Sequence, residues 1–106
     1  MVVCVVDWIP CFQTYKREYR AHAIKKMVER NIGFNEIDEA SGTLQIVKEY
    51  ADDTPYASCL ALAFTKKNRP LHLVFSVNPL AQTVYIITVY EPDSTQWNDT
   101  YTRRSE

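Results

Sequence analysis

The sequence predicts a single α+β domain in which an N-terminal helical hairpin packs on a four-stranded antiparallel meander. Apolar residues follow a helical spacing between about residues 20 and 40, and they alternate with a period of two further along the chain. Short polar turns separate the alternating segments, which favours antiparallel neighbours. A chain of 106 residues, 46 % of them apolar, fits one hydrophobic core and no second domain.

The two ends of the chain show neither period clearly. Met1–Val6 is rich in β-branched residues and Pro10 follows, so residues 1–12 are expected to form a variable arm or an extra edge strand. Residues 13–93 are expected to form the core of the domain, and the polar residues 94–106 a tail.

The predicted hairpin begins with a helix that starts near Arg20. Asn31 and Gly33 supply its stop signal, and a short second helix, Glu36–Ala40, follows. The buried side of the first helix is expected to consist of three apolar residues at helical spacing: Ile24, Met27 and Val28.

Four strands are predicted after the hairpin: Thr43–Tyr50, Ser58–Thr65, Leu71–Val77 and Thr83–Tyr90. In the third strand Leu71, Leu73 and Phe75 alternate with other residues, and these large side chains are expected to face the helices. In the last strand the inward set is taken to be Tyr85, Ile87 and Val89, although Val84 and Ile86 would then point outward.

Cysteine usage and hydropathy indicate a cytoplasmic protein. The three cysteines are scattered and odd in number, which suits a reducing compartment better than a disulfide framework. The longest apolar run, Met1–Val6, is far too short to cross a bilayer. Two histidines without paired ligand spacing predict no metal site, and no sequence motif indicates a cofactor.

Charge is segregated along the chain. Residues 13–31 hold six basic and two acidic residues, whereas residues 32–65 hold six acidic residues and one basic residue. Such a surface could offer one side to a phosphate backbone and the other to a protein partner, although segregated charge is also common on ordinary solvated surfaces.

The two histidines are the first candidates for chemistry. His22 lies on the polar face of the predicted first helix, near its start, where the helix dipole favours the neutral imidazole that a general base needs.

His72 lies in the middle of the third predicted strand, and its side chain is expected to point to the opposite face from the large apolar residues of that strand. On the expected parity of the last strand, Thr88 and Tyr90 share its face. A histidine, a hydroxyl and a phenol on one open face suit proton transfer and base stacking. The simpler alternatives are an exposed histidine and a half-polar sheet face.

Four stretches of the sequence resemble the bacterial family named domain of unknown function 4258. They are Tyr19–Ile32, Glu49–Pro55, Pro70–Val74 and Ile86–Asp93, and the resemblance spans about residues 15–97. The combination of these stretches is more specific than any one of them. This chain departs from the family at Asn31, where glycine is usual; asparagine tolerates the same left-handed turn.

The resemblance implies a RelE-like or barnase-like ribonuclease fold whose open sheet face binds RNA. Members look like toxins of toxin–antitoxin pairs, several of them encoded beside an antitoxin of zinc-finger type. The expected partners are therefore RNA and a cognate antitoxin. The polar positions that match the family are His22, Arg30, His72, Thr88 and Tyr90.

The hypothesis that follows is metal-free RNA cleavage through the 2′-hydroxyl. His72 is the first choice for base or acid, with Tyr90 beside it, and Arg30 or Lys26 would stabilise the charge at phosphorus. The remaining expected RNA-binding residues are Arg20, Lys25 and Thr88. His22 could reach the open face only around a sheet edge, so it is either catalytic there or holds the start of the helix.

Two alternatives remain open at this point. One is a non-catalytic module that docks a protein through the acidic middle of the chain and an uncovered sheet edge. The other is a nucleic-acid binder without cleavage, which the basic first helix would serve.

Overall fold

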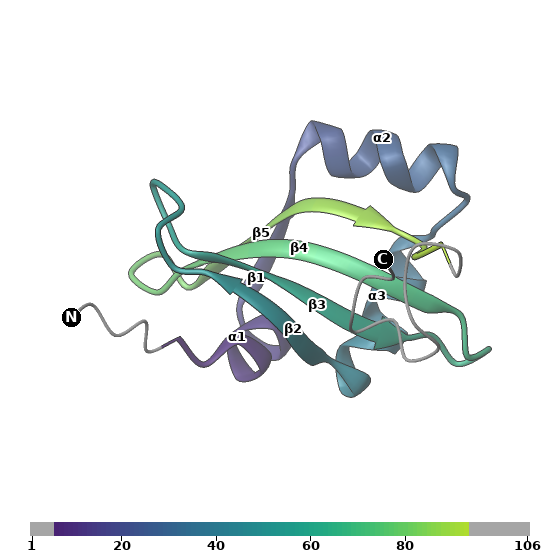
Figure 1. The fold of residues 1–106 in the computed structure, drawn as a ribbon, viewed down its shortest axis with the longest axis horizontal. Helices are drawn as coiled ribbons and strands as arrows, with labels where there is room; N and C mark the ends of the chain where they lie inside the picture. The colour runs from purple at the N-terminus through teal and green to yellow at the C-terminus, as the bar shows by residue number, and fades with distance from the viewer. Residues whose placement is uncertain (1–5, 94–106) are drawn as a thin grey trace.

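The computed structural model describes residues 6–93 of the chain, and the structural statements below concern this range. The helices and strands follow one another along the chain as shown in Figure 1. In order they are α1 (Trp8–Thr14), β1 (Lys16–Tyr19), α2 (Ala21–Glu29), α3 (Phe34–Ala40), the 3-10 turn η1 (Ser41–Thr43), β2 (Gln45–Tyr50), β3 (Ser58–Phe64), β4 (Pro70–Asn78) and β5 (Thr83–Tyr90). Residues 1–5 of the expected N-terminal arm and the expected tail, residues 94–106, lie outside the described range.

One five-stranded sheet organises the fold, with strand order β1-β5-β4-β3-β2. Strands β2 to β5 form the expected antiparallel meander, whereas β1 pairs with β5 in parallel. The α+β class is therefore confirmed, but the prediction of a four-stranded, purely antiparallel sheet is wrong. The missed strand has only four residues, Lys-Arg-Glu-Tyr, and its charged side chains give no strand signal.

The N-terminal segment also differs from the expected arm or edge strand. Residues 8–14 form α1, and Trp8 and Phe12 lie one turn apart on its buried side. Their ring centroids lie 5.9 and 4.8 Å from that of Phe75 on β4. Pro10 does not end the element, because in the first turn of a helix its missing N–H has no partner to lose.

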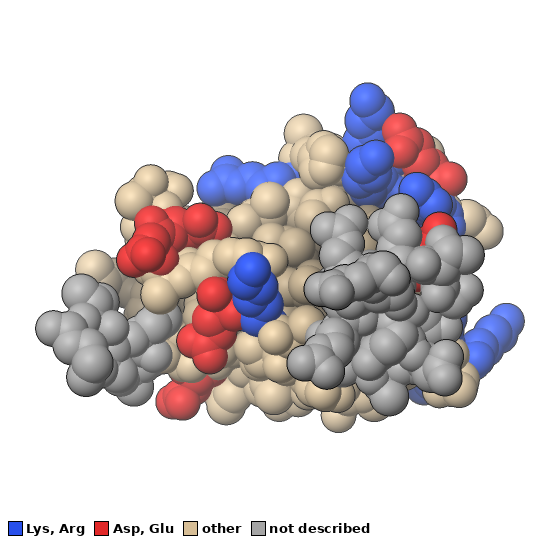
Figure 2. Space-filling view, viewed as in Figure 1, with Lys and Arg blue, Asp and Glu red and all other residues tan. Residues whose placement is uncertain are grey.

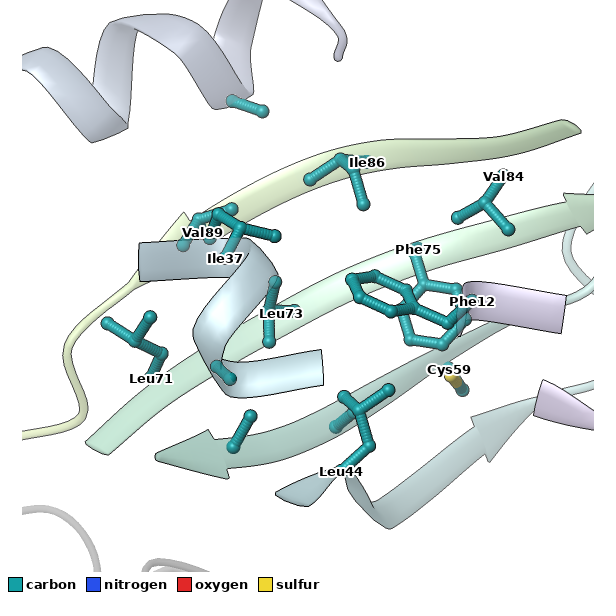
Figure 3. Packing of buried hydrophobic residues seen from close by; sticks show 14 of the residues in the cluster. Phe12, Ile37, Leu44, Cys59, Leu71, Leu73, Phe75, Val84, Ile86 and Val89 are labelled. Carbon is teal, nitrogen blue, oxygen red and sulfur yellow. The ribbon is translucent and has the colours of Figure 1, made fainter. Parts of the chain in front are cut away.

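The hydrophobic core lies between the sheet and the helices α1 and α3, as Figure 3 shows. Phe12 from α1 and Ile37 from α3 are fully buried against it. The inward side chains of the three central strands are Cys59, Ala61, Ala63, Leu71, Leu73, Phe75, Val77, Val84, Ile86 and Val89. Fully burying a side chain such as Leu73 stabilises the fold by roughly 1.5–3 kcal/mol.

Helix α2 packs against β5 through a narrower stripe than predicted. Ala23 and Met27 are buried, whereas Ile24 and Val28 are 41 % and 77 % exposed. Only Met27 of the three predicted core residues is therefore buried. The buried stripe of α2 consists of Ala23 and Met27, which lie one turn apart. The sequence pattern predicted the larger apolar residues Ile24 and Val28 to be buried in place of Ala23. None of the described helices is long and apolar enough to cross a membrane.

A single arginine joins the helical hairpin to the sheet. The Arg69 guanidinium donates hydrogen bonds to the carbonyl oxygens of Arg30 and Asn31, at 2.7 and 3.0 Å. It also forms ion pairs with Glu36 of α3 and with Glu91, which follows β5, each at 3.2 Å. Asn31 takes a positive φ of 54° at the end of α2, which turns the chain towards α3.

Candidate functional site

A bulge in β5 decides which side chains face away from the helices. Val74 pairs with Thr88, but Phe75 pairs with Ile86, so Ile87 is an extra residue. The expected inward set was therefore wrong at Tyr85 and Ile87, because Val84 and Ile86 face the core there, and it was correct at Val89. The bulge also places Thr88 and Tyr90 on the same face as His72, as expected.

The first polar cluster on this face, called the open face below because the core with α1 and α3 lies on the other one, is the pair His72 and Tyr90. The two residues are directly opposite each other on β4 and β5, and their ring centroids lie 5.3 Å apart. His72 Nδ1 and the Tyr90 hydroxyl oxygen are 3.2 Å apart. Either group donates this hydrogen bond, depending on the tautomer of the imidazole. His72 is fully buried and Tyr90 is half-buried, so the phenol is the more accessible member of the pair.

The second cluster lies further along the same face, around Tyr85. The Arg20 guanidinium stacks over the Tyr85 ring, 4.5 Å from its centroid. Tyr56 stacks almost parallel to Tyr85, with 5.9 Å between centroids and 19° between planes. The Asn78 amide donates to the Tyr56 hydroxyl oxygen at 3.0 Å, which fixes that ring. Arginine and tyrosine rings on an open sheet are groups on which RNA bases stack.

A pocket of about 200 Å³ lies beside this second cluster, between the β2–β3 turn and the sheet. Arg20 and Asp53 line it, together with Ser58 and Ser76, two nearly buried serines. The Ser58 hydroxyl donates a hydrogen bond to the Asp53 carboxylate. Arg20 was expected to bind RNA, whereas no functional role was predicted for Asp53.

The other predicted residues lie on or next to α2. His22, Lys25 and Arg30 are exposed, and Lys26 is paired with Glu29 at 3.6 Å. Within residues 6–93, His22 has no hydrogen bond or ion pair, and it does not contact His72. The structure therefore brings together His72, Thr88 and Tyr90 but leaves these α2 side chains apart from them.

Charged side chains gather in two regions of the surface that Figure 2 shows. Lys and Arg side chains cluster over α2, and Asp and Glu side chains gather at the β2–β3 end of the sheet. This arrangement follows the segregation along the sequence. Among the described residues, no group of three or more His, Cys, Asp or Glu side chains is placed to hold a metal ion.

A second groove, of about 390 Å³, lies on the helix side of the sheet next to β1. Arg17 and Asp38 form an ion pair in it, and the ring of Tyr19 packs against Phe34 with 4.7 Å between centroids. Burial raises the pKa of Tyr19 above its ordinary value of 10.0. The aromatic and ion-paired residues of this groove contact one another, so they contribute to stability at the sheet edge.

Comparison with known proteins gives one match. No curated protein and no solved structure matches this chain. The family described as Domain of unknown function (DUF4258) matches residues 19–91, which include both polar clusters of the open face and the whole of α2. The expected resemblance is thus confirmed over more than half of the sequence, and the chain belongs to the DUF4258 family.

Proposed function

We propose that this protein is a metal-independent endoribonuclease, the toxin of a bacterial toxin–antitoxin pair. The observation that carries the proposal is the hydrogen-bonded pair of His72 and Tyr90 on the sheet face that α1 and α3 leave uncovered. A RelE-like arrangement, with helices on one face and RNA on the other, would use this face for chemistry. Such an enzyme works in the cytoplasm and is neutralised there by a cognate antitoxin, of zinc-finger type on the family resemblance.

Tyr90 is the catalytic residue in this proposal, and His72 acts through it. Because His72 is fully buried, the half-buried Tyr90 phenol is the group that meets the RNA. The pair takes the proton of a ribose 2′-hydroxyl, with Tyr90 accepting it as His72 accepts the phenolic proton. Proton transfer by a positioned side chain accelerates a reaction typically by about 10²–10⁴-fold.

The reaction is an internal transfer at phosphorus. The 2′-oxygen forms a bond to the phosphorus atom, and the bond from phosphorus to the 5′-oxygen of the next nucleotide breaks. The pair returns its proton to that 5′-oxygen. The products are a 2′,3′-cyclic phosphate and a free 5′-hydroxyl, and the enzyme ends in its starting protonation state.

The basic side chains have a supporting role. Arg20 is the arginine that contacts the open face, through Tyr85, so it is better placed than Arg30 to bind a phosphate there. The exposed Lys25 and Arg30, with the half-buried Lys26, make α2 a basic surface that attracts the RNA backbone. Thr88, next to Tyr90 on the same face, offers a hydroxyl for hydrogen bonds to the RNA.

The proposal is tested with single-stranded RNA in the presence of EDTA and by expression in a bacterial host. We expect cleavage products that end in a 2′,3′-cyclic phosphate, together with growth arrest and RNA decay on induction. His72→Ala is expected to abolish both effects. His22→Ala serves as the matched control, because His22 lies away from the open face, and it should behave as the wild type.

A non-catalytic module that binds a protein partner is the second candidate. The exposed Ile24 and Val28 on α2 favour it, because large apolar side chains on a helix surface suit protein contacts. Intact RNA and normal growth at high expression of folded protein would contradict the ribonuclease and support this alternative.

A further inference from the structure

The pocket next to Tyr85 combines a cation and an anion, and each is oriented by a neighbouring side chain: Tyr85 for Arg20 and Ser58 for Asp53. Arg20 and Asp53 line its rim, and Ser58 and Ser76 line its floor. The serines are 1 % and 7 % exposed, so little of either side chain is accessible to solvent. A volume of about 200 Å³ is below the roughly 300–1,000 Å³ of pockets that enclose a whole drug-sized ligand. It suits one part of a larger molecule.

Arg20 is preorganised for an anion. Its guanidinium rests on the Tyr85 ring, and its backbone N–H donates to the Ile86 carbonyl oxygen at 2.9 Å. Within residues 6–93 the Arg20 side chain has no ion pair or hydrogen bond, in contrast to Arg17 and Arg69, whose guanidinium groups are engaged. Its N–H donors are therefore available to bind a phosphate in the planar geometry that arginine favours.

Asp53 is oriented to accept a hydrogen bond. The Ser58 hydroxyl donates to Oδ2 of the carboxylate, and the Asp53 backbone N–H donates to the Tyr50 carbonyl oxygen at 3.2 Å. No described residue donates to the other oxygen, Oδ1. A carboxylate repels phosphate, so the ligand must present a hydroxyl or an amine to Asp53 while its phosphate lies at Arg20.

A ribonucleotide has both groups within one unit. We propose that this pocket is a ribose-phosphate subsite for single-stranded RNA, in which Arg20 binds the phosphate and Asp53 accepts a hydrogen bond from the ribose 2′-hydroxyl. The base lies outside the pocket, against the exposed part of the Tyr56 ring, which Asn78 holds in place. Because DNA lacks the 2′-hydroxyl, Asp53 would make the subsite selective for RNA.

The subsite lies on the same face as the proposed catalytic pair. Ser76 is four residues from His72 along β4, a separation of about 13 Å in an extended strand. A strand of RNA would thus be held at one nucleotide and cleaved at another. This part of the inference rests on the proposed ribonuclease, but the selectivity for ribose is a property of the pocket and is measured without cleavage.

The test is direct binding of short oligonucleotides to the full-length protein, followed by fluorescence anisotropy. The protein carries Tyr90→Phe so that the RNA stays intact, and the probes are RNA, its 2′-fluoro analogue and DNA of the same base sequence. The 2′-fluoro analogue keeps an RNA-like sugar but has no hydroxyl proton to donate. Tighter binding of RNA than of either analogue is expected, and equal binding of all three would overturn the proposal.

Two substitutions then separate the roles of the charged residues. Asp53→Asn is expected to weaken RNA binding about tenfold and to leave DNA binding unchanged or slightly stronger. Arg20→Gln is expected to weaken binding of RNA and DNA alike and to lower the salt dependence of binding by about 0.7 in log–log slope. The matched control is Asp52→Asn, an exposed neighbour that does not line the pocket.

The direction of the Asp53 effect is decisive. If the carboxylate only repelled the RNA, its removal would strengthen RNA binding, as is expected for Asp52→Asn. Unchanged or tighter RNA binding by Asp53→Asn would therefore overturn the subsite. Selective loss of RNA binding in that variant supports the subsite even if the wild type cleaves no RNA, and in that case only the proposed ribonuclease fails.

Discussion

At the scale of single residues, Arg69 connects more of the molecule than any feature of the sequence suggested. It lies in a basic run, Lys66-Lys-Asn-Arg69, between two predicted strands, and the sequence assigned it no structural role. In the structure the Arg69 side chain is only 24 % exposed. Its guanidinium binds backbone carbonyl oxygens at the end of α2, Glu36 in the first turn of α3 and Glu91 after β5. The partners come from three distant segments, and no local pattern reveals such convergence.

Replacing Arg69 is expected to destabilise the fold. Arg69→Ala should lower the free energy of unfolding by about 2–3 kcal/mol, because carbonyl and carboxylate acceptors lose a charged donor. Arg69→Lys should recover less than half of this loss, because a single ammonium cannot reach all four partners. Urea unfolding measures both values. Lys67→Ala, an exposed neighbour, is the control and should unfold like the wild type; an equal loss there would contradict this role for Arg69.

Asn31 is a second position where one residue determines the local backbone. Its φ of 54° is costly for most side chains but not for glycine or asparagine. Asn31→Gly, the residue that the family resemblance leads one to expect there, should leave the stability within about 0.5 kcal/mol, and Asn31→Val should lower it by about 1–2 kcal/mol. Thermal unfolding of the two variants measures the difference. Equal stability of both would show that the turn does not require a positive φ.

Tyr19 gives the fold a specific alkaline sensitivity. Burial raises its pKa in the folded protein above 10.0, so the unfolded chain ionises first as the pH rises. The unfolded state then binds fewer protons, and stability falls as the pH passes through 10 and beyond. Tyr19→Phe should therefore lose less stability than the wild type between about pH 9 and 11, as followed by urea unfolding. A steeper loss in the variant would contradict this assignment.

At the scale of elements, the sequence predicted those whose periodic pattern is complete within the element. The last strand was predicted with its observed bounds, Thr83–Tyr90. The prediction for β3 differed by one residue at its C-terminal end, and that for β4 by one residue at each end. The elements missed were the short ones whose partners lie far along the chain. Strand β1 exists because Lys16–Tyr19 meets β5 at Thr83–Ile86, and its own four residues carry no strand pattern.

Pattern analysis also fails where an element departs from regular geometry. The bulge at Ile87 reverses the parity of β5 midway, so no single alternation describes the strand. This is why Thr88 and Tyr90 were grouped correctly with His72 while Tyr85 was placed on the wrong face. The Arg20–Tyr85 stack could not be predicted for the same reason.

Helix α1 belongs to the core, and this is testable. Phe12 is fully buried and its ring packs on Phe75. Phe12→Ala should therefore lower the free energy of unfolding by about 3–5 kcal/mol. The exposed Gln13→Ala, which loses one hydrogen bond to the Ser41 carbonyl oxygen, should cost about 1 kcal/mol. If chemical denaturation gave equal values for both, residues 8–14 would be an arm and not part of the core.

At the scale of the whole molecule, the two faces of the sheet have different roles. One face holds α1 and α3 and the apolar core. The other carries the His72–Tyr90 pair and the pocket of Arg20 and Asp53, and the basic helix α2 lies along the β5 side. The first cluster could be predicted from strand parity and the family resemblance. The second cluster could not be predicted, because it forms only where the β2–β3 turn and the start of α2 come together over β5 in the folded chain.

The most direct test of the proposed function is the single-turnover rate of RNA cleavage by Tyr90→Phe relative to the wild type, in EDTA. This substitution removes one oxygen and keeps the ring, so the fold is retained, whereas replacing the buried His72 also disturbs packing. We predict a rate lower by about 10²–10⁴-fold with RNA binding unchanged. Cleavage by Tyr90→Phe at the wild-type rate would contradict the assignment of chemistry to this pair.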